Sequence, residues 1–295
     1  MVRGLGHGLG VIAVARFPFG AVSSARPPRR PEGDARAFVL GVYPSALHVR
    51  WTLPAWAAPV VDRQVVASLA VDVEPVVFWD GEQPDAASLV DAWAASHFPD
   101  EAADQVGDVA PGSNGFSGRV VDSEVLAPLG CSPGEVWLTD AVNRYFVKRG
   151  NRRQAGQAAV IEEVYQPIAT RLGLPEASLP VRPTPAVLVD RAVEAEAERL
   201  LGEWQEARAP LLITLGEESR RVAARLADRV DGPPERRLRA DDPAYGRPGR
   251  IDLGGRTAEW MALTHPGNRD RRWREAIAAW ARSQQPEAEP QSPGN

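Results

Sequence analysis

The chain has 295 residues, of which 44% are hydrophobic and 25% are charged, a composition that excludes a fibrous or wholly disordered protein. Its 34 Lys and Arg residues and 39 Asp and Glu residues give a formal net charge of −5, which excludes a surface that is positive throughout. One cysteine, Cys131, excludes an internal disulfide and a four-cysteine zinc or iron–sulfur site. This cysteine usage fits a reducing cytoplasm.

Three segments differ in composition along the chain. Residues 1–33 and 284–295 are rich in Arg-Pro or in Pro, Glu, Ser and Gly, so we predict flexible tails around one domain at residues 34–283. The first tail has some likeness to a secretion signal, but Arg16 interrupts its apolar stretch, so an N-terminal extension or a misassigned start is the favoured interpretation. No apolar run reaches the roughly 18–20 residues of a spanning helix, and we expect no membrane segment.

Four short apolar runs predict strands that are buried on both faces. These strands are expected at residues 37–44, 135–140, 211–216 and 259–264. Two further runs, residues 64–71 and 74–79, predict a β-hairpin insertion near residues 63–80, with Pro75 marking an edge strand.

Apolar residues at helical spacing lie between these strands. They predict helices near Trp93, Val121, Ile161, Val189 and Trp273, with Thr184-Pro185 as a helix start, and a further helix is expected from Glu217. Strands that alternate with helices imply a parallel sheet covered on both sides. The predicted fold is therefore an α/β fold, a three-layer α/β/α sandwich with a four-stranded, mainly parallel sheet.

Ligands of an open parallel sheet bind beyond the carboxyl ends of its strands, so the residues at those ends are candidates for a site. The first strand runs into the turn Gly41-Val42-Tyr43-Pro44-Ser45, the second ends at Asp140, and the fourth runs into His265. The chain has no glycine loop with phosphate-binding spacing, no Gly-x-Ser-x-Gly elbow and no histidines with metal-ligand spacing. We therefore expect neither a metal nor an organic cofactor.

Taken together, the strand-end motifs resemble those of the uracil-DNA glycosylase superfamily, in the same order over about residues 35–283. The motifs that carry the likeness are Gly41-Val42-Tyr43-Pro44, Gly115-Phe116-Ser117-Gly118, and residues 136–140, 211–216 and 264–267. In the family, the first of these holds a water over the sugar, the second stacks a phenylalanine on the flipped base, and the last carries the catalytic histidine.

The resemblance implies excision of a DNA base by hydrolysis of its N-glycosidic bond. His265 would stabilise the departing base, Phe116 would stack on it and Asp140 would recognise its edge. The turn after the first strand would complete the site, with Tyr43 as a second catalytic candidate. The remaining base-binding candidates in that turn are Gly41, Pro44 and Ser45.

Two residues depart from the family pattern. Tyr43 stands where several members have an acidic or amide side chain, and a neutral phenol is a poor base at pH 7, so water activation is unassigned and Tyr43 is better interpreted as a pocket wall. Asp140 stands where asparagine recognises uracil. An ionised carboxylate only accepts hydrogen bonds and would repel the uracil O4, so we expect a base other than plain uracil, such as one with an exocyclic amine.

Each candidate also has a structural interpretation. His265 could cap the fourth strand, Asp140 could cap the loop that follows it, and His48 is better explained by packing than by catalysis. Phe116 is harder to explain as a core residue, because glycine-rich loops are exposed.

Two basic clusters flank the predicted site, one after the second strand and one after His265. We predict that they form a local rim for DNA phosphates, although solvated helix surfaces would also explain them. The predicted phosphate contacts are Arg149, Arg152, Arg269, Arg271 and Arg272.

The complete prediction is a monomeric, cytoplasmic, glycosylase-like hydrolase with DNA as its partner and no contact with a membrane. Two alternatives stay open. The missing acidic residue in the first motif favours a non-catalytic protein of the same fold that binds nucleic acid or a nucleobase. The net negative charge favours a hydrolase of small nucleosides.

Overall fold

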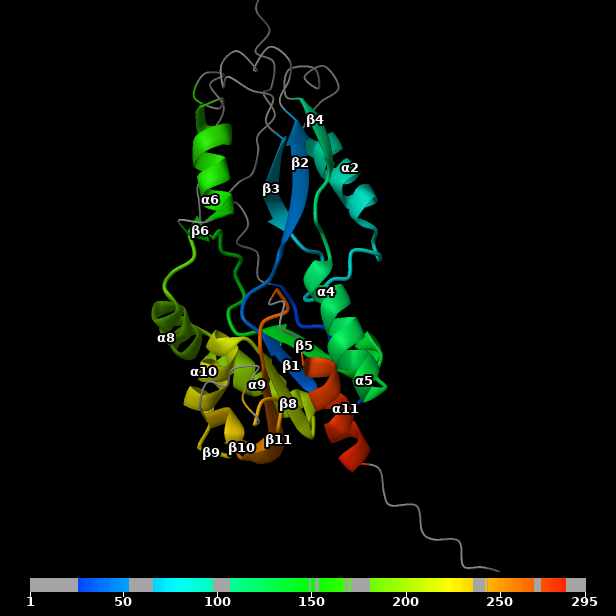
Figure 1. Cartoon of the computed structure of the whole chain (residues 1–295), viewed down its shortest axis with the longest axis vertical. Helices are drawn as coiled ribbons and strands as arrows, with labels where there is room; N and C mark the ends of the chain where they lie inside the picture. Colours follow the sequence, from blue (N-terminus) through cyan, green and yellow to red (C-terminus); the bar gives the residue numbers. More distant parts are fainter. Residues whose placement is uncertain are drawn as a thin grey trace, which may run out of the picture.

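The computed structural model describes residues 26–52, 66–97, 107–148, 150–151, 154–167, 170, 181–235, 242, 244–267 and 272–284. These residues form a mixed α/β fold around a six-stranded, mainly parallel sheet (Figure 1). The described part of the chain contains no helix that is both long and apolar enough to cross a membrane.

The sheet has the strand order β5-β1-β8-β11-β10-β9. Its four parallel strands are β5 (Trp137–Asp140), β1 (Phe38–Gly41), β8 (Leu211–Leu215) and β11 (Arg256–Leu263). These are the four strands that the apolar runs predict. Two antiparallel strands, β10 (Gly249–Leu253) and β9 (Arg229–Asp231), extend the sheet beyond β11, so the predicted count of four strands is wrong.

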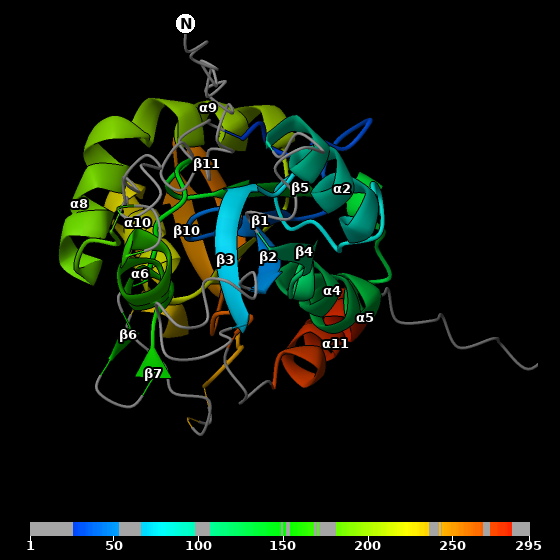
Figure 2. The same cartoon turned by 90° about the horizontal axis from the view of Figure 1, so that it is seen from above.

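Helices cover both faces of this sheet, as Figures 1 and 2 show. One face packs against α8 (Pro185–Ala195), α9 (Ala197–Ala207) and α10 (Glu217–Leu226). The other face packs against α4 (Phe116–Val121), its π-helical continuation η3 (Asp122–Leu126), α5 (Ala127–Leu129) and α11 (Trp273–Ser283). The predicted start at Thr184 is confirmed, because its side chain accepts a hydrogen bond from the backbone N–H of Val187.

A second sheet stands above the carboxyl ends of the parallel strands in Figure 1. It has the order β3-β2-β4 and consists of β3 (Val66–Val73), β2 (Ala46–Thr52) and β4 (Asp108–Pro111). A separate apolar core joins it to α2 (Ala86–His97), α6 (Gln157–Val160) and the adjoining turn η5 (Ile161–Tyr165).

The predicted hairpin near residues 63–80 is wrong in its pairing. The strand β3 pairs antiparallel with β2, and residues 74–79 form turns instead of a second strand. Pro75 has no N–H to donate to a ladder, and Phe78 has a φ of 52°, which an extended strand does not allow.

Four short elements complete the described part. They are the 3-10 turns η4 (Pro133–Glu135) and η6 (Pro233–Glu235) and the strand pair β6 (Gly150–Asn151) and β7 (Gln154–Ala155).

The start of the domain lies before the predicted boundary at residue 34. Backbone hydrogen bonds join Arg29 to Leu138 in both directions, at 2.9 and 3.0 Å. The Asn143 side chain accepts from the N–H of Arg26 and donates to its carbonyl. Residues 26–29 are therefore part of the fold, while residues 1–25 and 285–295 of the predicted tails lie outside the described residues.

The connections of the parallel strands determine where a ligand can bind. The chain leaves β1 and reaches β5 on one side of it, whereas it leaves the neighbouring β8 and reaches β11 on the opposite side. Neighbouring connections that diverge in this way open a crevice at the carboxyl ends of the strands.

Candidate active site

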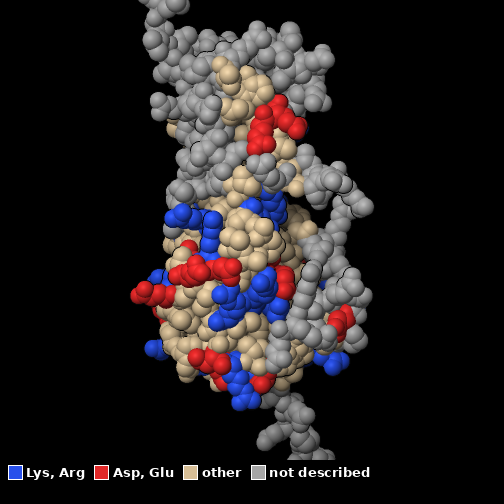
Figure 3. Space-filling model, turned by 90° about the vertical axis from the view of Figure 1, so that its left-hand side faces the viewer, with Lys and Arg blue, Asp and Glu red and all other residues tan. Residues whose placement is uncertain are grey.

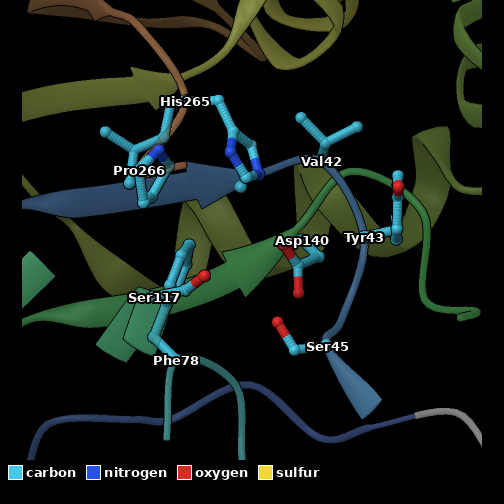
Figure 4. A pocket seen from close by; sticks show the side chains of 10 residues that line it. Val42, Tyr43, Ser45, Phe78, Ser117, Asp140, His265 and Pro266 are labelled. Carbon is cyan, nitrogen blue, oxygen red and sulfur yellow. The ribbon is translucent and has the colours of Figure 1, made fainter. Parts of the chain in front are cut away.

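A pocket occupies this crevice and gathers residues from four strand ends (Figure 4). The parallel strands supply Gly41, Asp140 and Leu215 from their last positions, and the segment after β11 supplies His265. The complete lining is Gly41, Val42, Tyr43, Ser45, Phe78, Ser117, Asp140, Leu215, His265 and Pro266. Five of the predicted site residues therefore meet in one pocket: Gly41, Tyr43, Ser45, Asp140 and His265. Pro44, the sixth candidate of this region, is buried in the same turn but does not line the pocket.

The pocket is narrow. It encloses about 300 Å³ including open solvent at its mouth, but the centre of a water molecule has only about 20 Å³ in which to move. A space of this size holds about one water molecule. A nucleobase therefore fits only when side chains of the pocket wall move.

Gly41 is required by the close approach of the Asp140 side chain. A Cβ atom at position 41 would lie 2.1 Å from Oδ1 of Asp140 and 2.7 Å from Cζ of Phe78. Any side chain at position 41 would overlap these atoms. Glycine avoids the overlap, so the Asp140 carboxyl can lie against the end of β1.

Asp140 is an almost completely buried carboxyl group. Its exposed fraction is 5%, and its side chain points into the pocket beside Ser45 in Figure 4. Burial raises the pKa of Asp140 to about 7, although the positive charge of Arg199 opposes this shift and the negative charge of Glu203 adds to it. The sequence interpretation assumed an ionised carboxylate, whereas the neutral form is strongly populated near pH 7.

Glu74 is a second buried carboxyl group near Asp140, and the sequence did not single it out. Its exposed fraction is 4%. Burial, and after it the charge of Asp140, raises the pKa of Glu74 to about 8, against the opposing effects of a hydrogen bond from the N–H of Gly115 and of the charges of Arg26 and Arg119. The sequence pattern did not indicate a role for Glu74, because it predicted an edge strand at residues 74–79.

His265 is held as a neutral ring at pH 7. Although part of the residue is exposed, the loss of water around the ring, together with the charges of Lys148 and Arg182, lowers the pKa of His265 to about 4, against the opposing charge of Glu218. The N–H of Gly267 donates to Nδ1 of the ring at 3.0 Å, so Nδ1 carries no proton. The proton of the neutral ring is therefore on Nε2, which becomes a hydrogen-bond donor.

The residue before His265 is fixed by two aromatic side chains. The hydroxyl of Tyr245 accepts from the N–H of Thr264 at 3.1 Å, and Nε1–H of Trp273 donates to Oγ1 of Thr264 at 2.9 Å. These bonds fix the end of β11 and so the place where His265 leaves the sheet.

Tyr43 lies in the pocket wall and does not act as a base at neutral pH. Burial raises the pKa of Tyr43 to about 12, although the charge of Arg182 lowers it. The guanidinium carbon of Arg182 lies 5.5 Å from the centre of the Tyr43 ring, and Phe146 packs edge-on against the ring at 5.7 Å. Arg182 also forms an ion pair with Glu218 in the first turn of α10.

Phe78 also lines the pocket with an aromatic ring, and the sequence interpretation missed it. Its φ of 52° is unusual for a non-glycine residue and depends on the packing around it. Phe116, the predicted stacking residue, is the first residue of α4 and is 47% exposed, while its neighbour Ser117 lines the pocket. Stacking by Phe116 stays a prediction.

Two glycines around Phe116 serve close packing. A Cβ atom at Gly115 would lie 2.1 Å from the carbonyl oxygen of Asp80, and one at Gly118 would lie 2.2 Å from that of Trp79. The glycines therefore bring the start of α4 against the backbone that carries Phe78, whereas the sequence suggested a flexible loop.

Most of the predicted DNA-binding rim lies outside the described residues, namely Arg149, Arg152, Arg269 and Arg271. Arg272 is described and exposed, and it lines a separate groove beside α11 together with Tyr245 and Trp280. Figure 3 shows Lys and Arg side chains beside Asp and Glu side chains on the face that carries α8 and α10 in Figure 1. The described part of this face is therefore of mixed charge.

Within the described residues, no group of three or more His, Cys, Asp or Glu side chains is arranged to hold a metal ion. The chain matches no protein-family model and no curated protein. A proposal for the function therefore depends on the geometry of the site and on the sequence motifs that form it.

Proposed function

We propose that this protein excises a base from DNA by hydrolysing its N-glycosidic bond, within a three-layer α/β/α fold of the uracil-DNA glycosylase type. The observation that carries the proposal is the meeting of His265, Asp140 and the Gly41–Ser45 turn in one pocket at the carboxyl ends of the parallel strands. These residues come from three motifs that are distant in the sequence, and their meeting in one pocket supports the proposal.

The proposed reaction breaks the bond between the sugar carbon C1′ and a base nitrogen. The bond pair goes to the base, the oxygen of a water molecule bonds to C1′, and the water loses a proton to solvent. Negative charge develops on a carbonyl oxygen of the departing base. The Nε2–H of neutral His265 is suited to donate to that oxygen, since a donor fixed at the point of charge development lowers the barrier.

The base must leave the helix before it can enter a pocket of this kind. Phe116, exposed at the start of α4, supports the role of a stacking surface, and Phe78 supplies an aromatic wall inside the pocket. Asp140 contacts the edge of the base. We propose that the protein acts as a monomer in the cytoplasm and that the basic rim holds the DNA backbone.

Two observations favour the alternatives. Because Tyr43 is a neutral phenol, the first motif offers no base to activate water, which favours a non-catalytic protein that binds a nucleobase or nucleic acid. The mixed charge in Figure 3 favours a hydrolase of small nucleosides, whose substrates carry no run of phosphates.

Base release from a panel of oligonucleotides tests the proposal. The panel holds uracil, hypoxanthine, xanthine, cytosine and oxidised or alkylated bases in single and double strands, with free nucleosides beside them. The proposal expects release of at least one base from DNA and loss of that release in His265→Ala, with His48→Ala in the second sheet as the control that retains it. Release from nucleosides alone would favour the small-nucleoside hydrolase, and binding without release would favour the non-catalytic protein.

A further inference from the structure

The residue Asp140 is 5% exposed and its carboxyl group lines the pocket, and within the described part of the chain no group donates a hydrogen bond to its two oxygens. Arg199 is the nearby cation, but its NH1 group donates to Thr139 and Glu203 and its NH2 group to the backbone carbonyl of Asp140. A buried carboxylate without hydrogen bonds is unfavourable, so this group is satisfied by a proton, by the water molecule that the pocket can hold, or by a ligand that displaces this water. Figure 4 shows the carboxyl pointing into the pocket, where a ligand would meet it.

A carboxyl group presents two different edges to a ligand. The neutral form has one donor and one acceptor, as an asparagine amide does, whereas the ionised form has acceptors only. Uracil presents a ring N–H beside a carbonyl oxygen, which matches the neutral form. A ring N–H beside an exocyclic amine, as in guanine and in isocytosine, matches the ionised form.

We infer that Asp140 selects the base by the protonation of its carboxyl group: the neutral form binds a ring N–H beside a carbonyl, and the ionised form binds a ring N–H beside an amine. This inference rests on the proposed function and specifies which bases the site accepts. It also removes the reason to exclude plain uracil, since a neutral Asp140 donates to the uracil O4.

Charged and titratable groups from four parts of the fold act on this carboxyl. Arg199 and Glu203 on α9 act in opposite directions, with Arg199 favouring the ionised form and Glu203 the neutral form. Tyr43, after β1, is neutral over this range, whereas Glu74, after β3, has a pKa of about 8, so it is mostly neutral at pH 7 and its ionisation towards pH 8 opposes that of Asp140. His265, after β11, titrates near pH 4 and stays neutral over the range in which Asp140 changes.

Binding of two free bases to the full chain tests the inference. Isocytosine has an amine in place of the uracil O2 and one ring N–H fewer, but it is nearly the same size and keeps the carbonyl at C4, so the ratio of the two affinities cancels effects of size. Between about pH 6 and about pH 8 the neutral fraction of Asp140 falls from about nine-tenths to about one-tenth, so uracil should bind about tenfold more weakly at the higher pH. Isocytosine can present its ring N–H beside either the amine or the carbonyl and so matches both forms, and its affinity should therefore change much less over this range. Calorimetric titration at the two pH values gives both dissociation constants.

Two variants locate the effect. Asp140→Asn carries a permanent donor and acceptor, so its uracil affinity should not change with pH. Glu203→Gln removes a negative charge that raises the pKa of Asp140, so the midpoint of the change should move to lower pH. Glu203 lies outside the pocket lining and provides a second test if Asp140→Asn does not fold.

Three results would overturn the inference: no binding of either base, a wild-type uracil-to-isocytosine ratio that is the same at both pH values, or a pH dependence that persists in Asp140→Asn. Failure of the proposed function is visible separately, as the absence of base release from every oligonucleotide. Free bases that bind with the expected pH dependence would then leave the specificity of Asp140 intact and show a nucleobase-binding protein.

Discussion

At the scale of single residues, the site depends on a glycine that has no side chain and on two carboxyl groups that are neutral to a large extent near pH 7. Gly41 gives its space to the Asp140 carboxyl, and Asp140 and Glu74 are largely or substantially neutral because burial disfavours their ionised forms. Both effects have measurable consequences for stability, independent of any substrate.

Replacing Gly41 by Ala should destabilise the fold by about 1–3 kcal/mol, because the new Cβ atom overlaps Oδ1 of Asp140 and the Phe78 ring. Chemical denaturation measures this change. Gly202→Ala on α9 is the matched control: a Cβ atom there meets nothing within 4 Å, so the substitution should be neutral or stabilising by up to about 1 kcal/mol. Equal stabilities of Gly41→Ala and the wild type would contradict the close approach.

Glu74 makes the folded protein less stable as the pH rises. Its folded pKa is above its unfolded value, so the folded state binds the extra proton and loses this advantage as the pH rises from about 4.5 towards 8. Glu74→Gln should therefore raise the free energy of unfolding by on the order of a few kcal/mol at about pH 8, relative to wild type, and by much less at about pH 4. Denaturation of both proteins at the two pH values gives the difference, and a gain that is independent of pH would exclude burial of an ionisable carboxyl as its cause.

At the scale of elements, the four parallel strands were predictable because each is a short, continuous apolar run between turn or helix signals. The strands β2, β9 and β10 were not, since they mix exposed and buried positions and lack such a run. The residues of the site divide in the same way, into those at the ends of the predictable parallel strands and those in other segments. Gly41, Asp140 and His265 end or follow parallel strands and were found from the sequence.

Glu74, Phe78 and Arg182 were missed because they come from irregular segments, whose positions are decided by tertiary packing. Phe78 approaches the pocket because glycines about forty positions away in the chain leave room for its backbone. Arg182 is positioned by its contact with the aromatic ring of Tyr43. Neither relation leaves a periodic signal in the sequence.

The end of β11 offers a test of how an element positions His265. Tyr245→Phe removes the hydroxyl that accepts from the N–H of Thr264 and leaves this partly buried group without that acceptor. The expected cost is about 1–3 kcal/mol of stability, together with slower base release because His265 is less firmly held. Release that is slower at saturating substrate, with unchanged binding of DNA, would show positioning, whereas unchanged release would exclude it.

At the scale of the whole molecule, an acidic chain is proposed to bind an acidic polymer, and this requires a local concentration of positive charge. The charge pairs of the described face, such as Arg225 with Asp190, leave little net attraction there. The proposed binding of DNA therefore depends on the predicted rim after His265.

Neutralising Arg271 and Arg272 together should weaken DNA binding and reduce its dependence on salt, because fewer counterions are released from the phosphates. The control is Arg225→Gln, which removes one arginine from a paired site and should leave the salt dependence nearly unchanged. Dissociation constants over a series of salt concentrations give the slopes. Identical slopes for the wild type and the double variant would remove the rim from the proposal.

The central claim is that His265 and Asp140 form the catalytic pocket of a base-excising hydrolase. Its most direct test is the single-turnover rate of base release from a uracil-containing oligonucleotide at about pH 6, where Asp140 is mostly neutral. The wild-type chain should release uracil, and His265→Ala should do so about 10²–10³-fold more slowly while it still binds the DNA, as expected for loss of one donor to the developing negative charge. Equal rates in the two proteins, or no release of uracil by the wild type at this pH, would contradict the account.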